Sequence, residues 1–235
     1  MQIKCAYEHN GNDTLLYSTE YVGAFTRGKS IEEAKAKMPV EISRYCRYAG
    51  LPLPSDFSVE IVEEKDSDLN VCDADSDMIF QSEKLPLSFE EYNRLKALAL
   101  KSARDFLALY NSVPDKNKSA LEKRTTFYGE VPITAEEMYI HTKNVNAYYF
   151  GEIGIDVSND GDILSCRERG FALLERTPDF LENKSTVGSY GEEWSLKKVL
   201  RRFIWHDRIH AKAMYKMAKK TFPNVSIPDV FGFEE

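Results

Sequence analysis

The strongest constraint in this sequence of 235 residues is a stretch of helical periodicity near its C-terminal end. From Trp194 to Met217, apolar residues recur every three or four positions, which predicts an amphipathic helix with one buried face. His206 lies three positions beyond Phe203 and His210 lies seven beyond it, so both histidines continue the apolar stripe. A spacing of four places the two rings one turn apart on the same face. The sequence therefore predicts two inward-facing imidazoles on one helix.

A third histidine falls on an earlier helical pattern. Met138, His141, Val145 and Tyr148 form a second apolar line, so three of the four histidines in the chain lie on predicted inward faces. A single histidine on an apolar face is usually a core residue whose polar atoms are satisfied, and that interpretation stays open for each of the three. The alternative is a shared ligand.

The shared ligand that fits three imidazoles is a divalent metal. Burying one imidazole without a partner costs about 1–3 kcal/mol, and a common cation would remove that cost for all three. Three neutral imidazoles around one point also leave a coordination position open. We therefore predict a metal site formed by His141, His206 and His210.

Three motifs carry a resemblance to a known family. The first is Glu136-Glu137-Met138-Tyr139-Ile140-His141, the second is Glu193-Trp194-Ser195, and the third is the His206-x-x-x-His210 run. In this order they resemble the DinB-like superfamily over about residues 86–225. The resemblance implies a four-helix bundle in which one histidine of the second helix and an H-x-x-x-H of the last long helix bind a divalent metal. It also implies an enzyme, because the superfamily includes metal-dependent hydrolases and thiol S-transferases.

The N-terminal part, residues 1–65, is predicted to be a small α+β domain. We expect strands at Met1–Glu8, Thr14–Tyr17, Val22–Thr26 and Phe57–Val62. A helix is expected before the last strand, because Ser30-Ile31-Glu32-Glu33 is a capping box. The β-β-β-α-β order, with the run from Gly23 to Ala34 leading into the helix, resembles the HicB-like domain. Known members of that family act as antitoxins, but the sequence shows no basic recognition helix and we do not carry that role over.

The rest of the chain divides into a linker and a helical part. Residues 66–84 are predicted to be an acidic linker, because aspartates dominate and apolar residues are few. Residues 85–235 are predicted to form the all-α DinB-like four-helix bundle with the metal site. Its loops at 114–133 and 176–193 exceed the usual lengths of helix connections, so we expect them to form the walls of a substrate pocket.

Composition limits the partners. The formal net charge of −7 argues against a broad nucleic-acid surface, which needs clustered Lys and Arg. No apolar run approaches the roughly 20 residues that span a bilayer, and the N-terminus has no apolar signal segment. The four cysteines have no CxxC spacing and are interpreted as reduced thiols. We therefore expect a cytoplasmic protein that binds neither nucleic acid nor membrane.

A metal held by three histidines has two main uses. It can lower the pKa of bound water toward 7, or it can bind a thiolate and hold the sulfur deprotonated. The resemblance favours the second use and implies a small-molecule substrate together with a low-molecular-weight thiol such as bacillithiol, mycothiol or glutathione. Imidazole ligands accept several divalent metals, with Zn²⁺ or Ni²⁺ preferred here. Relatives with this bundle often pair, which leaves a homodimer open.

Four further polar residues are assigned roles near the predicted metal. Asn144 is expected to orient a substrate, with a simple core hydrogen bond as the alternative. Tyr148 is expected to donate a proton, with packing as the alternative. Arg202 is expected to bind an anionic thiol, with a surface salt bridge as the alternative. Asp207 points about 100° away from the preceding residue and is expected to brace a metal-binding ring through a hydrogen bond.

Two classes of function follow. One is a metal-dependent thiol S-transferase or hydrolase. The other is a non-catalytic protein-binding module whose metal site is structural or a relic. A pocket above the metal that is open to solvent and lined by polar groups favours the enzyme, whereas a fourth protein ligand favours the module. His9 is the one histidine left that could supply such a ligand.

Overall fold

The computed structural model describes residues 1–126 and 129–234, and the chain forms two compact units. Unit 1 contains Met1–Glu83 together with Glu234, and unit 2 contains Lys84–Phe233. The described residues include a four-stranded sheet and five α-helices. The mixed α+β class that the sequence predicts is confirmed. Each unit is described by itself below.

Unit 1 is built on the four-stranded sheet. Its elements are β1 (Gln2–Asn10), β2 (Asp13–Ser18), β3 (Phe25–Gly28), α1 (Ile31–Ala49) and β4 (Ser58–Asp66). The strand order is β3-β2-β1-β4, in which β1 pairs antiparallel with β2 and parallel with β4. A parallel pair needs a long crossover, and α1 provides it. Ser30 caps α1 by accepting a hydrogen bond from the backbone N–H of Glu33, as the capping box predicts.

The third strand begins later than the sequence pattern indicates. Val22–Thr26 was the expected range, but the chain first makes a turn in which the Ala24 N–H donates to the Tyr21 carbonyl at 2.8 Å. Gly23 in this turn has a φ of 99°, a value that glycine adopts without strain. The strand therefore begins only at Phe25.

Residues 66–84 do not form the exposed acidic linker that was predicted. Val71, Met78 and Phe80 in this segment are buried, and the Phe80 ring lies 5.7 Å from the ring of Tyr17 in β2. The segment up to Glu83 therefore belongs to unit 1. The prediction was wrong because it weighed the many aspartates, whereas three apolar anchors are enough to hold such a segment against a core.

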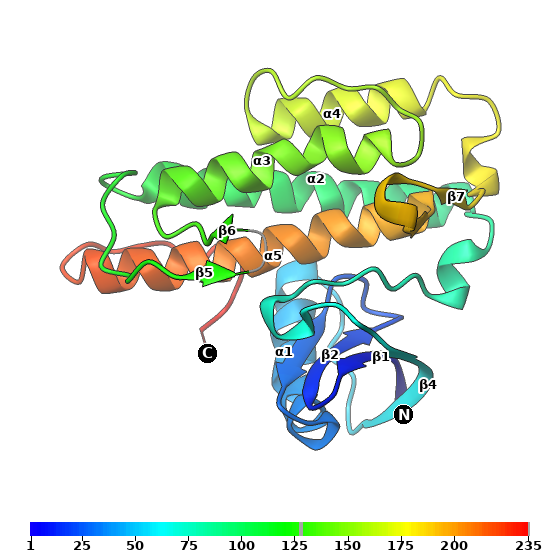
Figure 1. The fold of residues 1–235 in the computed structure, drawn as a ribbon, viewed down its shortest axis with the longest axis horizontal. Coiled ribbons are helices and arrows are strands. Elements are labelled where there is room, and N and C mark those ends of the chain that lie inside the picture. Colours follow the sequence, from blue (N-terminus) through cyan, green and yellow to red (C-terminus); the bar gives the residue numbers. More distant parts are fainter. Residues whose placement is uncertain (127–128, 235) are drawn as a thin grey trace. The chain divides into compact units, whose positions relative to one another are not determined.

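Unit 2 contains four helices, α2 (Phe89–Ser112), α3 (Ala135–Gly151), α4 (Ile163–Leu174) and α5 (Leu196–Thr221). Helices α2 and α3 each pack against both α4 and α5, and the four lie side by side (Figure 1). Each begins at a residue whose side chain accepts a backbone N–H three positions on, namely Ser88, Thr134, Asp162 and Ser195. Among the described residues, no helix combines the length and the apolar content that a membrane crossing requires.

The remaining elements are short. Two hairpins join β5 (Thr125–Thr126) to β6 (Gly129–Glu130) and β7 (Thr186–Val187) to β8 (Glu193–Trp194). Single 3₁₀ turns cover Val71–Asp73, Gln81–Lys84, Phe180–Glu182 and Ser189–Gly191. The C-terminal tail packs within unit 2, where Phe231 and Phe233 are buried and the Phe233 ring lies 6.2 Å from that of Tyr215.

Helices α3 and α4 approach each other closely at one glycine. A methyl group on Gly170 would lie 2.1 Å from the ring of Phe150, so the two helices can take their present positions only without a side chain there. Phe150 is fully buried and packs against Phe171 and Phe203, with ring centroids 5.3 and 5.1 Å apart. The ring therefore has no free direction in which to move.

We predict that Gly170→Ala destabilises the protein by about 1–3 kcal/mol, because an extra methyl group in a filled core forces side chains off their preferred rotamers. The matched control is Gly151→Ala in α3, where an added methyl group meets nothing within 4 Å. That change should stabilise the helix by up to about 1 kcal/mol. Urea denaturation of both variants measures the difference, and equal stabilities would contradict the close approach of the two helices.

Candidate metal centre

Three histidines from two helices converge on one point. His141 comes from α3, and His206 and His210 come from α5. One nitrogen from each ring can be chosen so that all three lie within 4.8 Å of one another. The ring centroids of His206 and His210 are 4.4 Å apart, and those of His141 lie 5.1 and 4.6 Å from them. The structure thus brings together the three imidazoles that the sequence selected.

The spacing of the nitrogens suits a shared cation. Nε2 of His141 and Nε2 of His206 face each other at 3.2 Å. In a tetrahedral zinc site with metal–nitrogen distances of about 2.0–2.1 Å, two ligand nitrogens lie about 3.3 Å apart. The separation of this one pair is close to that value, and the three nitrogens together lie within 4.8 Å of one another, so small side-chain shifts would bring the donor set around a divalent metal. Without a metal, one ring donates its proton to the other.

All three imidazoles are held in the neutral form that binds metals. Burial, followed by the neighbouring imidazoles, keeps the pKa of His206 well below its usual range. Burial, followed by the influence of His141, lowers the pKa of His210 to about 3. Burial also lowers the pKa of His141. A neutral ring has a free lone pair, so each histidine can act as a ligand without first losing a proton.

The second nitrogen of His206 has no partner in the described structure. His206 is only 9% exposed, and its Nδ1 is buried without a hydrogen bond. In many metal sites the outer nitrogen of a histidine donates to a carboxylate or carbonyl that fixes the ring. Such a brace is missing at His206 in the described part of the chain, so another constraint must hold the ring.

The buried face of α3 is not the one that the sequence predicted. The expected line contained Met138, His141, Val145 and Tyr148, but the buried residues of the helix are Ala135, Met138, Tyr139, Thr142, Asn146, Tyr149 and Phe150. The prediction followed apolar residues, whereas Thr142 and Asn146 are polar and are buried through hydrogen bonds. The true face is therefore rotated by about one residue, or 100°.

This rotation decides how the metal centre meets solvent. His206 is buried, His210 is intermediate and His141 is exposed. The cluster therefore lies at the edge of the α3–α5 contact rather than at the fully buried point that was expected. His141 is the exposed member of the cluster.

Tyr149, which the sequence argument missed, takes the place next to the cluster that was assigned to Tyr148. Its ring lies 6.0 Å from that of His206 in an edge-on arrangement, and it is buried. Tyr148 is 36% exposed and packs edge-on against Trp194 at 5.8 Å. Burial raises the pKa of both phenols, which keeps them protonated. The buried periodicity that includes Thr142 would have identified Tyr149, because the two are seven positions apart.

Arg202 forms the salt bridge that was its alternative, with Glu192, but the pair is largely buried and lies in an aromatic environment rather than at the surface. It is 9% exposed, and its guanidinium carbon lies 5.0–5.8 Å from the ring centroids of Trp205, Trp194 and Tyr149. Its Nη2 is 3.6 Å from a Glu192 carboxylate oxygen. Because Tyr149 contacts both His206 and Arg202, the arginine is linked to the metal centre through one ring.

Asn144 is exposed, and the hydrogen bond at its position uses its backbone carbonyl, which accepts from the side-chain amide of Asn159 at 2.9 Å. The alternative of a core hydrogen bond is therefore wrong for this side chain. Its role in orienting a substrate stays a prediction.

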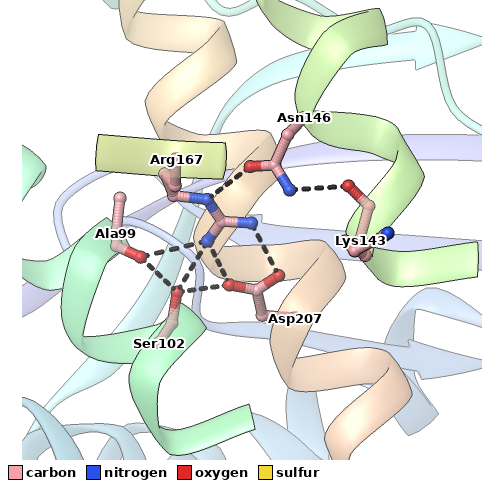
Figure 2. Close-up of polar contacts among 6 residues, drawn as sticks. All are labelled: Ala99, Ser102, Lys143, Asn146, Arg167 and Asp207. Atoms are coloured by element: carbon pink, nitrogen blue, oxygen red, sulfur yellow. Dashed lines mark hydrogen bonds and ion pairs between the residues drawn. The ribbon is translucent and has the colours of Figure 1, made fainter. Parts of the chain in front are cut away.

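Asp207 does not brace a metal-binding ring, and this expectation was wrong. It is fully buried and binds the guanidinium of Arg167 with both oxygens, as Figure 2 shows. Ser102 donates to the same carboxylate at 2.5 Å. The partner of Asp207 comes from another helix, α4, and could not be identified from the sequence.

A fourth ligand does not join the three histidines within the described residues. His9, which was the candidate, is held in unit 1 by two carboxylates. Its Nε2 is 3.1 Å from Glu64 and its Nδ1 is 3.6 Å from Asp66. Three protein ligands leave a coordination position for a substrate, as in catalytic zinc sites.

The loop at 114–133 was expected to form a wall of the substrate pocket. Its described part lines a cavity of about 140 Å³ together with Glu137 at the start of α3. The lining residues described are Lys123, Glu130, Val131, Pro132, Ile133 and Glu137. They include none of the three histidines, so this cavity gives no support to the predicted wall.

The chain matches no model of a protein family, no curated protein and no solved structure. The DinB-like and HicB-like resemblances therefore rest on the sequence motifs alone. What the metal centre can do has to be inferred from its own residues.

We predict that the metal-free protein loses stability as the pH falls below about 6.5. The folded-state pKa values of the histidines lie below the ordinary value of about 6.5, so the unfolded chain takes up protons first. Stability is therefore complete above this pH and decreases toward pH 3, by at most about 1.4 kcal/mol per pH unit for each buried ring.

Urea denaturation between pH 7.5 and pH 5 in the presence of a chelator measures this dependence. The variant His210→Gln keeps a neutral amide in place of the ring and should show a smaller slope. The same slope in both proteins would show that His210 is not held neutral by the fold.

Proposed function

We propose that His141, His206 and His210 bind one divalent metal, Zn²⁺ or Ni²⁺, and that the protein is a metal-dependent enzyme. The observation that carries the proposal is the convergence of three neutral imidazoles with facing nitrogens 3.2 Å apart. Exposure of His141 supports access by a small-molecule substrate. A purely structural site is usually closed by a fourth ligand, which the described residues do not supply.

The reaction we favour is thiol transfer, in which the sulfur of a low-molecular-weight thiol attacks an electrophilic carbon. A C–S bond forms as the bond from that carbon to its leaving group breaks, the leaving group departs with the bonding electron pair, and the thiol proton is released to solvent. The metal would act as a Lewis acid that lowers the pKa of a bound thiol. Hydrolysis is the alternative reaction, and its carboxylate-assisted form needs an acidic residue as general base beside the metal-bound water. The nearest carboxylate in sequence, Asp207, is committed to Arg167, and the three-histidine group contains no acidic residue within the described chain.

The surroundings suit an anionic thiol. Arg202 carries a positive charge one turn before His206 on α5, paired with Glu192 at 3.6 Å, so an anionic thiol would have to compete with this carboxylate. Trp194 and Tyr149 provide aromatic surface next to Arg202. Thiols that carry carboxylates, such as glutathione, would gain from this charge. We therefore retain Arg202 as the residue proposed to bind the anionic part of the thiol.

The fold assignments are part of the same proposal. We propose a DinB-like bundle for residues 85–235 and a HicB-like domain for residues 1–65. The first is supported by the origin of the ligands, one from α3 and two from α5 at a spacing of four. The second is supported by the observed order of strands and helix in unit 1.

We predict that the purified protein contains about one divalent metal per chain and that His206→Ala loses it, because two remaining ligands bind a divalent cation far more weakly than three. Elemental analysis after exhaustive dialysis gives the stoichiometry. The matched control is His9→Ala, which removes the one histidine outside the cluster and should leave the metal content unchanged. Equal metal in the His206→Ala protein would sink the proposed site.

We further predict metal-dependent consumption of thiol when the protein is mixed with an alkyl halide and bacillithiol, mycothiol or glutathione. The rate should disappear with a chelator and in His206→Ala. Replacement of Arg202 by Gln should raise KM for glutathione more than for uncharged 2-mercaptoethanol, because only the former carries carboxylates. Hydrolysis of an ester substrate without thiol consumption would instead favour the hydrolase.

A further inference from the structure

A fully buried polar network joins all four helices of unit 2 around the guanidinium of Arg167 in α4 (Figure 2). Two of its nitrogens donate to the Asp207 carboxylate of α5, Nη1 to Oδ2 and Nη2 to Oδ1. Its Nε donates to the side-chain oxygen of Asn146 in α3 at 3.0 Å. In α2 it donates to the carbonyl of Ala99 at 3.0 Å and to the hydroxyl of Ser102 at 3.4 Å.

The network contributes more to the geometry of the four helices than to the free energy of unfolding. Arg167, Asp207, Asn146 and Ser102 all have 0% exposure. Removing a charge pair from water costs several kcal/mol, and similar pairs can often be replaced by apolar residues without loss of stability. Such a pair does impose a geometry, because the planar guanidinium of an arginine can donate to all of its acceptors in only one arrangement.

The arrangement it imposes bears directly on the metal centre. Asp207 follows His206 in α5, and Asn146 lies five positions after His141 in α3. Arg167 therefore forms hydrogen bonds to both helices that carry the histidines, α3 and α5, although its own helix, α4, contributes no histidine to the cluster. The Nδ1 of His206 has no hydrogen-bond partner that would fix the ring. The network can restrain the ring indirectly, because it binds the next residue of the same helix, Asp207. The ring can be fixed through its helix instead of through a hydrogen bond.

We propose that the Arg167 network is the positioning frame of the three-histidine centre: it sets the rotation of α3 against α5 and thereby the 3.2 Å separation of the His141 and His206 nitrogens. Arg167, Asp207 and Asn146 are positioning residues and touch no substrate. The consequence for metal affinity rests on the proposed function, but the consequence for the distance between the rings does not.

The test compares two nearly isosteric changes on the same buried face of α3. Asn146→Leu removes the one hydrogen bond from α3 to Arg167. Thr142→Val removes a buried hydroxyl that bonds only to the Met138 carbonyl of its own helix, at 2.8 Å. Both lose one buried polar group, but only the first uncouples α3 from α4 and α5. Zn²⁺ affinity, measured by competition with a chromogenic chelator, should fall about 10-fold or more in Asn146→Leu and stay unchanged in Thr142→Val.

A second variant tests whether a loss of Zn²⁺ affinity could arise from misfolding of the protein. Replacing both charges, as in Arg167→Met with Asp207→Leu, leaves no unpaired ion in the core and should keep the helices folded. Its Zn²⁺ affinity should fall by at least as much as that of Asn146→Leu, while circular dichroism and urea denaturation show a folded protein. A folded double variant that binds Zn²⁺ as tightly as the unchanged protein would overturn the proposal.

A readout without metal separates this proposal from the proposed function. In the metal-free protein, the rings of His141 and His206 are close enough for a nuclear Overhauser effect between them. That signal should persist in Thr142→Val and weaken or vanish in Asn146→Leu. If the unchanged protein binds no Zn²⁺, the proposed function fails and the ring-to-ring signal alone decides: its loss in Asn146→Leu supports the positioning frame, and its persistence refutes it.

Discussion

One buried charge pair, the fork of Arg167 on Asp207, connects all four helices of unit 2 through its hydrogen bonds. Apolar contacts fill the core around it, but they are not directional and do not by themselves specify one rotation of each helix. An arginine that must satisfy partners on three other helices at the same time removes this freedom. The proposed positioning of the three histidines rests on that restriction.

The two polar clusters of the bundle differ in how they are satisfied. Around Arg167, donors and acceptors are matched, as expected for a network that specifies structure. Around the histidines, two nitrogens face each other and a third, Nδ1 of His206, is buried without a partner. Buried groups that are left unmatched and forced into one ionisation state are typical of functional sites. The contrast supports a ligand for the histidines and a structural task for Arg167.

Sequence periodicity predicted the helices of unit 2 and the histidines that meet between them, because a 3.6-residue repeat fixes which side chains share a face. It failed where polar residues are buried. Thr142 and Asn146 lie on the buried face of α3, where hydrogen bonds satisfy their polar groups. The predicted apolar line was therefore one residue away from the true buried face, and Tyr148 was chosen instead of Tyr149. The partner of Asp207 is 40 positions away, and such a pairing exists only after the helices have packed. The prediction of a linker at 66–84 was wrong for the opposite reason. It gave weight to the many charged residues and overlooked the few apolar residues that are buried.

The burial of Thr142 and Asn146 also bears on where the histidine cluster lies. His141 is exposed, whereas His206 is buried and His210 is intermediate. Rotation of α3 by one residue, imposed by the burial of Thr142 and Asn146, turns His141 to the edge while its Nε2 still faces that of His206. A polar residue that costs free energy to bury can thus decide whether a metal site is structural or accessible. In this protein the burial of Thr142 and Asn146 leaves His141 exposed, and this exposure is what supports the proposed enzyme over the structural alternative.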